Sequence, residues 1–379
     1  MPPDVSPLTI RTSVSEEGDY QSNPLLTPQG GRATYGSVTT PQVDLIANTA
    51  TTSIDLMALM NANVYNLARF SSEDGHATLS VVNRGAIWTE KLGGSFDYDT
   101  TRTSEETSSG LEVAGVRHGA ASIAPEVDYL LSPADELSIA ASYSGAKYSN
   151  TQLFTDYVVA TVSPGYTRLF DADNKASFNA IGRRYETRSG FGVQFTDLGG
   201  SVEWNSQLDQ RWLLDVALGE LHRSSHYDPI GGIPISGASV WDTTYSVSAG
   251  YTGLVDNFTI SASRAPTPLS IRTEAVISKF TLSGSHFVTT RLELDLAATY
   301  QFANFDGTEG PYVYLQKNYL SVAPKVQYHV TNTLSFAVNG NFRRQQAEGI
   351  GNGAVSVYDP AQSSGVMFTV SYVPNPKDM

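Results

Sequence analysis

The stretch Ser122-Ile123-Ala124-Pro125 leads through a tight turn to Leu137-Ser138-Ile139-Ala140. Apolar residues alternate with small or polar ones on both sides of the turn, which is typical of a β-hairpin with two different faces. Two further segments repeat the pattern, from Thr161-Val162-Ser163-Pro164 to Ala176-Ser177-Phe178-Asn179 and from Ser321-Val322-Ala323-Pro324 to Leu334-Ser335-Phe336-Ala337. We call these segments the proline hairpins, because each carries a proline at an equivalent place before its turn.

The same alternation continues along most of the chain. Clear examples are residues 136–144, 291–301 and 366–373. Many of these segments are longer than the strands of soluble sheets, which average about five to six residues. A strand that crosses a bilayer at a tilt needs about nine to eleven residues. The alternation therefore favours strands that span a membrane.

Connections between the strands alternate in length. Short turns, such as those near 132–135 and 331–332, are followed by longer polar segments, such as 104–114 and 347–363. One connection, around Ala265-Pro266-Thr267-Pro268, is brief. Alternating short turns and long loops are typical of outer-membrane barrels.

We therefore predict an all-β fold, a transmembrane antiparallel up-and-down β-barrel of about eighteen strands; sixteen is the alternative if the first pair is misread. Residues 1–379 form a single domain in this prediction. Residues 1–7 are a periplasmic N-terminal segment and 374–379 a C-terminal tail, with both termini on the side of the short turns.

Composition narrows the possible functions. A net charge of −14 argues against nucleic-acid binding, which needs a basic face. The absence of cysteine removes disulfides and thiolate metal sites. No run of 18 apolar residues occurs, so no helical membrane span is expected. The N-terminus lacks an apolar signal core, so we interpret Met1 as an added start on a mature bacterial outer-membrane sequence without its signal peptide.

Two features are expected to modify the barrel. Pro125, Pro164 and Pro324 each remove a hydrogen-bond donor from a sheet without edges, so each is predicted to mark a β-bulge. In the alternative interpretation, each proline ends a strand of a soluble sheet. The polar segment from Gly18 to Thr40 is expected to fold inward as a partial plug of the barrel.

Acidic residues alternate with apolar neighbours and are therefore expected to face the interior, which we call the lumen. A wide lumen lined by carboxylates concentrates cations. In the alternative interpretation, these acids only keep the interior hydrated. The predicted selectivity residues, with one base of the same parity, are Asp97, Asp99, Glu126, Asp128, Glu203, Glu293, Asp295 and Lys325.

Two arginine doublets lie near the long-loop ends of their strands. They are Arg183-Arg184 and Arg343-Arg344. As basic residues of the rim they would bind lipopolysaccharide phosphates, or pair with lumen acids to form a constriction, or remain solvated.

No catalytic or metal-binding pattern is recognisable. His222 and His226 have a spacing that suits a metal pair on a helix but not on a strand. No serine and histidine clearly share one depth in the barrel, and no phosphate-binding glycine loop precedes a helix. We therefore predict no enzyme, no metal and no cofactor.

Three segments resemble a family of Gram-negative outer-membrane barrels associated with exopolysaccharide and exosortase loci, the beta-barrel porin 2 group. The segments are Ser13-Val14-Ser15-Glu16-Glu17-Gly18-Asp19-Tyr20-Gln21-Ser22-Asn23-Pro24-Leu25-Leu26, Ser95-Phe96-Asp97-Tyr98-Asp99-Thr100-Thr101-Arg102 with Glu105-Glu106, and Leu131-Ser132-Pro133-Ala134-Asp135-Glu136-Leu137. The resemblance spans nearly the whole chain. It implies an outer-membrane location and a link to polysaccharide export, and it supplies no catalytic residues.

The sequence leads to two functional hypotheses. The first is a porin-like, cation-preferring channel for small polar solutes or exopolysaccharide, surrounded by outer-membrane lipid and lipopolysaccharide. The second is a non-conducting structural barrel that interacts with polysaccharide or its export machinery. The sequence leaves the oligomeric state open.

Overall fold

The computed structural model is almost entirely β-structure. It describes residues 8–27, 30–101, 115–150, 154–188, 192–229, 237, 239–269, 273–304, 313–351, 354–357, 360–375 and 377–378. A short helix in this part of the chain is η1, Ala68–Phe70. Among the described residues, no helix is long and apolar enough to cross a membrane.

The wall consists of 18 long strands, β1 to β17 and β19. The first nine are β1 (Leu8–Gln21), β2 (Thr34–Asn48), β3 (Thr52–Tyr65), β4 (Ser72–Arg84), β5 (Trp88–Thr100), β6 (Arg117–Ser132), β7 (Asp135–Tyr148), β8 (Tyr157–Leu169) and β9 (Asn174–Thr187). The others are β10 (Val193–Gln207), β11 (Trp212–Tyr227), β12 (Ser239–Thr252), β13 (Asp256–Leu269), β14 (Thr273–Phe287), β15 (Leu292–Asn304), β16 (Val313–His329), β17 (Leu334–Gly351) and β19 (Ala361–Tyr372).

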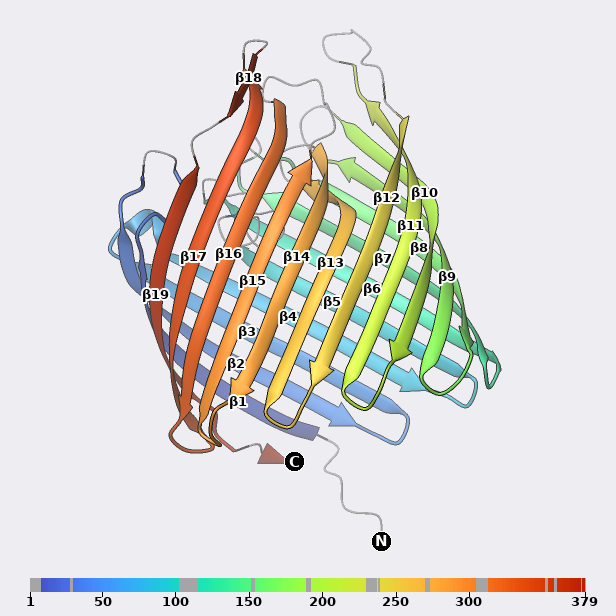
Figure 1. Ribbon diagram of the computed structural model, residues 1–379, viewed down its shortest axis with the longest axis horizontal. Helices are drawn as coiled ribbons and strands as arrows, with labels where there is room; N and C mark the ends of the chain where they lie inside the picture. The colour runs from blue at the N-terminus through green and yellow to red at the C-terminus, as the bar shows by residue number, and fades with distance from the viewer. Residues whose placement is uncertain are drawn as a thin grey trace.

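Every long strand pairs antiparallel with its neighbours, and the sheet closes on itself. β1 pairs with β2 along its whole length and with β19 from Val14 to Gln21, and β19 pairs with β17. The predicted antiparallel barrel of about eighteen strands is therefore confirmed. Figure 1 shows the tilted strands, with the start of β1 and the end of β19 at the end where the short turns lie. We call this the short-turn end and the opposite one the long-loop end.

Two short strands extend the pairing beyond the barrel. β18 (Ala354–Val357) pairs with the end of β17. β20 (Lys377–Asp378) pairs with Thr9 and Ile10, because β1 runs further toward the short-turn end than β19 does. Part of the expected C-terminal tail is thus attached to the sheet, and the expected periplasmic segment 1–7 lies outside the described residues.

The two faces of the wall differ as the alternation predicts. Large apolar side chains point outward and are exposed, for example Phe96 (53%), Leu198 (60%) and Leu218 (58%). Tyr98, Trp204 and Tyr372 are exposed on the same outer face. An apolar band with flanking aromatic residues is the surface that lipids cover in a transmembrane barrel.

The prolines do not mark bulges, and that prediction is wrong. Between β6 and β7 the paired residues go from Ile123–Tyr143 to Glu126–Ala140, so the pairing omits Pro125 without a change of register. Pro164 and Pro324 leave the same gap toward β9 and β17. The missing N–H therefore removes one step of hydrogen bonding, and no extra residue is inserted.

The expected plug is mostly wall. Residues 18–21 belong to β1 and 34–40 to β2, because both segments alternate like the other strands. Only the connection between them turns inward: Leu26 is 1% exposed and packs against Tyr319 and Ala361. Gln345 Nε2 donates a hydrogen bond to the Leu26 carbonyl at 2.8 Å.

Candidate functional site

The lumen surface is rich in charged side chains, and all eight predicted selectivity residues lie on the inward face of their strands. The inward acids are Glu17, Asp19, Asp44, Asp55, Asp74, Asp97, Asp99, Glu126, Asp128, Glu136, Asp197, Glu203, Asp215, Asp242, Glu293 and Asp295. The inward bases are Arg11, Lys91, Lys175, Arg183, Arg223, Lys279, Lys317, Lys325 and Arg343. Acids outnumber bases, but many of the acids have a basic partner.

Lys91 neutralises part of the acidic wall beside the first proline hairpin. Its Nζ lies 2.7 Å from Glu126 Oε1 and 2.8 Å from Asp128 Oδ2. Lys91 and Glu126 are directly opposite each other on β5 and β6. Asp128 is nearly buried, whereas Lys91 and Glu126 remain partly exposed to the lumen. One cation therefore serves two carboxylates.

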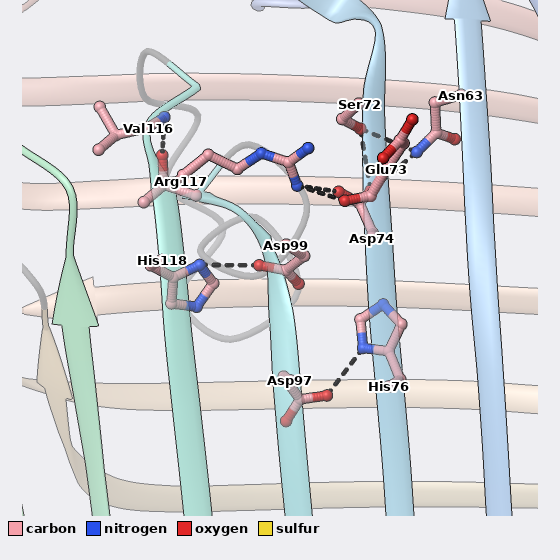
Figure 2. Close-up of polar contacts among 11 residues, drawn as sticks. Asn63, Ser72, Glu73, Asp74, His76, Asp97, Asp99, Val116, Arg117 and His118 are labelled. Carbon is pink, nitrogen blue, oxygen red and sulfur yellow. Dashed lines mark hydrogen bonds and ion pairs between the residues drawn. The ribbon is translucent and has the colours of Figure 1, made fainter.

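Nearer the long-loop end, the same wall carries three acid–base pairs. Figure 2 shows His76 pointing toward Asp97, and His118 toward Asp99 one step further along β5; each pair is separated by 2.8 Å. Arg117 reaches across to Asp74, also at 2.8 Å. His118 and Asp99 are both about 5% exposed, whereas Asp97 is 41% exposed.

A cavity of about 570 Å³ lies on the inner surface of β13 to β17 and β19. Glu293, Asp295 and Lys325 line it, together with the amide of Asn339 and several hydroxyl side chains. Lys325 Nζ lies 3.1 Å from Asp295 Oδ2, and His329 Nε2 lies 3.4 Å from Glu293 Oε2. Three of the predicted selectivity residues thus line one cavity.

Glu203 has a different environment. The Asn205 side-chain amide donates to Glu203 Oε1 at 3.0 Å and to Asp215 Oδ1. No basic side chain among the described residues forms an ion pair with Glu203. A neutral amide thus joins two lumen carboxylates at this place.

The arginine doublets are divided between the two faces of the wall. Arg183 points inward and pairs with Asp197, and Arg343 is buried with Nη2 2.9 Å from Gln21 Oε1. Arg184 and Arg344 point outward and are exposed. Adjacent residues on a strand face opposite sides, so a doublet cannot act as one basic site.

Sequence reasoning missed most of the inward bases. Lys91 and Arg223 sit at even spacing from lumen acids on their own strands, Asp97 and Asp215. Counting parity along each strand would therefore have identified them. Arg223 bonds to Asp197 at 3.2 Å and lies 3.4 Å from Asp242, which makes a buried row of charges with Arg183 across β9 to β12.

Buried aromatic residues lie on the inner side of the wall at the long-loop end. His118 stacks on Tyr148, and Tyr148 stacks on Phe154. Tyr157 packs against this group and against Tyr185, which contacts Phe195. The result is an aromatic band on the inner side of β6 to β10, covered rather than open to the lumen.

Catalytic and metal chemistry has little support in the described part of the chain. It contains no group of three or more His, Asp or Glu side chains placed to hold a metal ion. One serine and one histidine do meet, since Ser239 Oγ lies 2.6 Å from His222 Nε2 on the outer face. Among the described residues no carboxylate bonds to the other ring nitrogen, which a hydrolytic triad needs to orient its histidine.

The solved structures that are similar to this chain share little sequence identity with it. No family model matches the chain, and no curated protein matches it. The BenF-like porin of Pseudomonas fluorescens Pf-5 is a similar solved structure, with a TM-score of 0.48, 9% identity, and coverage of 96% of this chain and 99% of that chain. OccK2 (OpdF) of Pseudomonas aeruginosa, solved with glucuronate, has a TM-score of 0.47 and 11% identity, covering 96% and 97%. OpdK of Pseudomonas aeruginosa, solved with vanillate, has a TM-score of 0.44 and 11% identity, covering 97% and 99%.

Proposed function

We propose that this protein is an outer-membrane, porin-like channel that conducts small polar solutes passively. The observation that carries the proposal is the division of the wall into an apolar outer face and a charged inner face around a closed barrel. Barrels of 16–18 strands generally leave an aqueous channel. The cavity lined by Glu293, Asp295 and Lys325 supplies hydrogen-bonding groups for such a solute.

We further propose that the channel prefers cations, moderately rather than strongly. Carboxylates outnumber basic residues on the lumen surface, and this excess raises the local cation concentration. Lys91 and Lys325 neutralise several of the acids, which reduces the preference.

Planar-bilayer recording with a salt gradient tests both proposals. We expect discrete conductance steps and a reversal potential whose sign indicates that the channel prefers cations. Replacing the outward-facing Glu220 by Gln is a matched control, because this change should leave the reversal potential unaltered. Clear anion selectivity would contradict the cation preference, and the absence of any conductance would contradict the channel.

The second candidate is a non-conducting structural barrel. It is favoured by the buried aromatic band and by the inward connection at Leu26, both of which fill part of the lumen at the long-loop end. Absence of conductance in a protein that shows heat-modifiable migration would support this candidate. Lipopolysaccharide and a polysaccharide-export assembly are the partners proposed for it, and co-purification from membranes tests them.

A further inference from the structure

The pairing between β12 and β13 stops before the ends of the two strands at the long-loop end. Their pairing ends at Tyr245 and Arg264, although β12 begins at Ser239 and β13 continues to Leu269. The segment around Pro266 and Pro268, which the sequence suggested to be a brief connection, is therefore strand. It pairs with β14 only.

Two prolines explain why the pairing ends there. Gly253 N donates to Asp256 O at 2.7 Å, so even-numbered residues of β13 are those that exchange hydrogen bonds with β12. Pro266 and Pro268 are both even and lack the N–H. Two consecutive donors toward β12 are therefore missing. Thr243 O, which faces this gap, accepts a bond from Arg264 Nε at 3.3 Å instead.

The end of β13 that is not paired with β12, around Pro266, lies on the lumen side of the barrel wall. Arg183 Nη1 donates to Pro266 O at 3.3 Å. Arg183 is on β9, and in a regular sheet β9 and β13 would be about 19 Å apart along the wall, at about 4.8 Å per strand. An arginine side chain cannot cover that distance, so Pro266 has moved from the wall toward the lumen.

Burial of β14 gives the same result. Ala275, Val276, Ile277 and Ser278 are all between 0 and 8% exposed. In the wall, every second residue faces outward and is exposed, as Phe280 and Leu282 are on the same strand. Four consecutive buried residues mean that both faces of β14 are covered at this height.

We propose that residues 265–267 and 275–278, the upper arms of the β13–β14 hairpin, form the constriction of the pore, and that Arg183 positions them. Ion pairs with Asp197, which also pairs with Arg223, hold the Arg183 guanidinium in place beside the constriction. This proposal rests on the channel function proposed above. In this proposal, these ends of β13 and β14 determine the largest solute that can pass through the pore.

Cysteine pairs test the position of the arms without any conductance measurement, because the native chain contains no cysteine. Ser248 and Ser261 are partners in the paired part of β12 and β13, in a non-hydrogen-bonded position where Cα atoms are about 4.5 Å apart. Ser248→Cys with Ser261→Cys should therefore oxidise to a disulfide. Thr244→Cys with Ala265→Cys, the corresponding pair above the end of the pairing, should not. Equal crosslinking of the two pairs would overturn the proposal.

Restoring the donors tests the cause and the consequence. Pro266→Ala with Pro268→Ala should let β13 pair with β12, so that the Thr244→Cys and Ala265→Cys pair now crosslinks. The same double replacement without cysteines should raise the single-channel conductance, whereas the control Pro324→Ala should not. Continued absence of crosslinking, or crosslinking with unchanged conductance, would overturn the proposal. If no form of the protein conducts, the channel function fails, while the first crosslinking result still decides where the arms lie.

Discussion

The first and third proline hairpins have the same backbone and opposite charges. In both, the proline is on the outer face and the next residue points into the lumen: Glu126 in the first hairpin and Lys325 in the third. Each pairs with the residue directly opposite on the preceding strand, Lys91 and Asp295 respectively. The backbone of the unit in the wall is therefore the same in both hairpins, whereas the inward residues, which differ, determine the chemistry of the lumen surface.

The second hairpin supports this separation. Gly165 follows Pro164 at the equivalent inward position, and its neighbours are the Ser138 hydroxyl and the Asn179 amide. The backbone is unchanged, with the same gap in the pairing toward β9. One repeated unit thus presents an acid, no charge, or a base to the lumen.

The largest difference between the two charged hairpins should appear when the lysine is removed. Lys91→Met leaves the buried Asp128 without its cation, and we expect a loss of about 2 kcal/mol in the free energy of unfolding, below the cost of a fully buried pair because Lys91 is partly exposed. Lys325→Met leaves the more exposed Asp295, and we expect about 0.5 kcal/mol. Urea unfolding in detergent measures both.

The control for this pair is Lys91→Met combined with Asp128→Asn. Removing the buried charge together with its partner should recover most of the loss, because the penalty comes from the unpaired carboxylate. Equal losses for Lys91→Met and Lys325→Met would contradict the difference in burial on which the comparison depends.

Charge reversal should change ion selectivity in opposite directions at the two hairpins. Glu126→Lys reduces the acid excess of the lumen and should shift the reversal potential toward the value for anions. Lys325→Glu should shift it toward cations. Bilayer recordings in a salt gradient provide the measurement, and shifts of the same sign would show that these residues do not face the conducting path.

At outward-facing positions of the hairpins, the free energy of unfolding should depend on the size of the side chain and not on its charge. By continuation of the register, Gly340 lies opposite Pro324, and a Cβ built there would be 3.1 Å from the proline Cγ. Gly340→Val should therefore cost about 1 kcal/mol in unfolding free energy. It should leave the conductance unchanged. Altered selectivity in this variant would contradict the separation of wall and lumen.

The sequence predicts the wall better than the lumen, for a physical reason. Which face a residue lies on depends on local alternation, so Asp97 and Glu293 could be placed inward from their own strands. Which residues pair depends on register between strands, so the Lys91–Glu126 and Arg183–Asp197 pairs could not be read directly. The prolines show the same limit. Pro125 and Pro266 look alike in sequence. Pro125 interrupts the pairing of its strand at a single step, whereas Pro266 and Pro268 together end the pairing of β13 with β12.

The smallest expected effect concerns the turns that end the hairpins. Asp171 in the second hairpin accepts bonds from Asp173 N and Asn174 Nδ2, where the third hairpin has the Thr331 hydroxyl accepting from Thr333 N and Leu334 N. The Asp173 backbone N–H, with the Asn174 amide, lowers the pKa of Asp171 below its usual value.

Because the folded-state pKa of Asp171 is depressed, this carboxylate stabilises the fold above the pKa of the unfolded chain, and the contribution is lost as pH falls through the folded pKa. Asp171→Thr should therefore lower the melting temperature slightly at pH 7 and make its fall toward acidic pH smaller. Thr331→Ser should leave the pH dependence of the melting temperature unchanged. Melting curves between pH 7 and about pH 3 compare the two turns, and an identical pH dependence of Asp171→Thr and the native protein would show that the Asp171 carboxylate does not stabilise its turn.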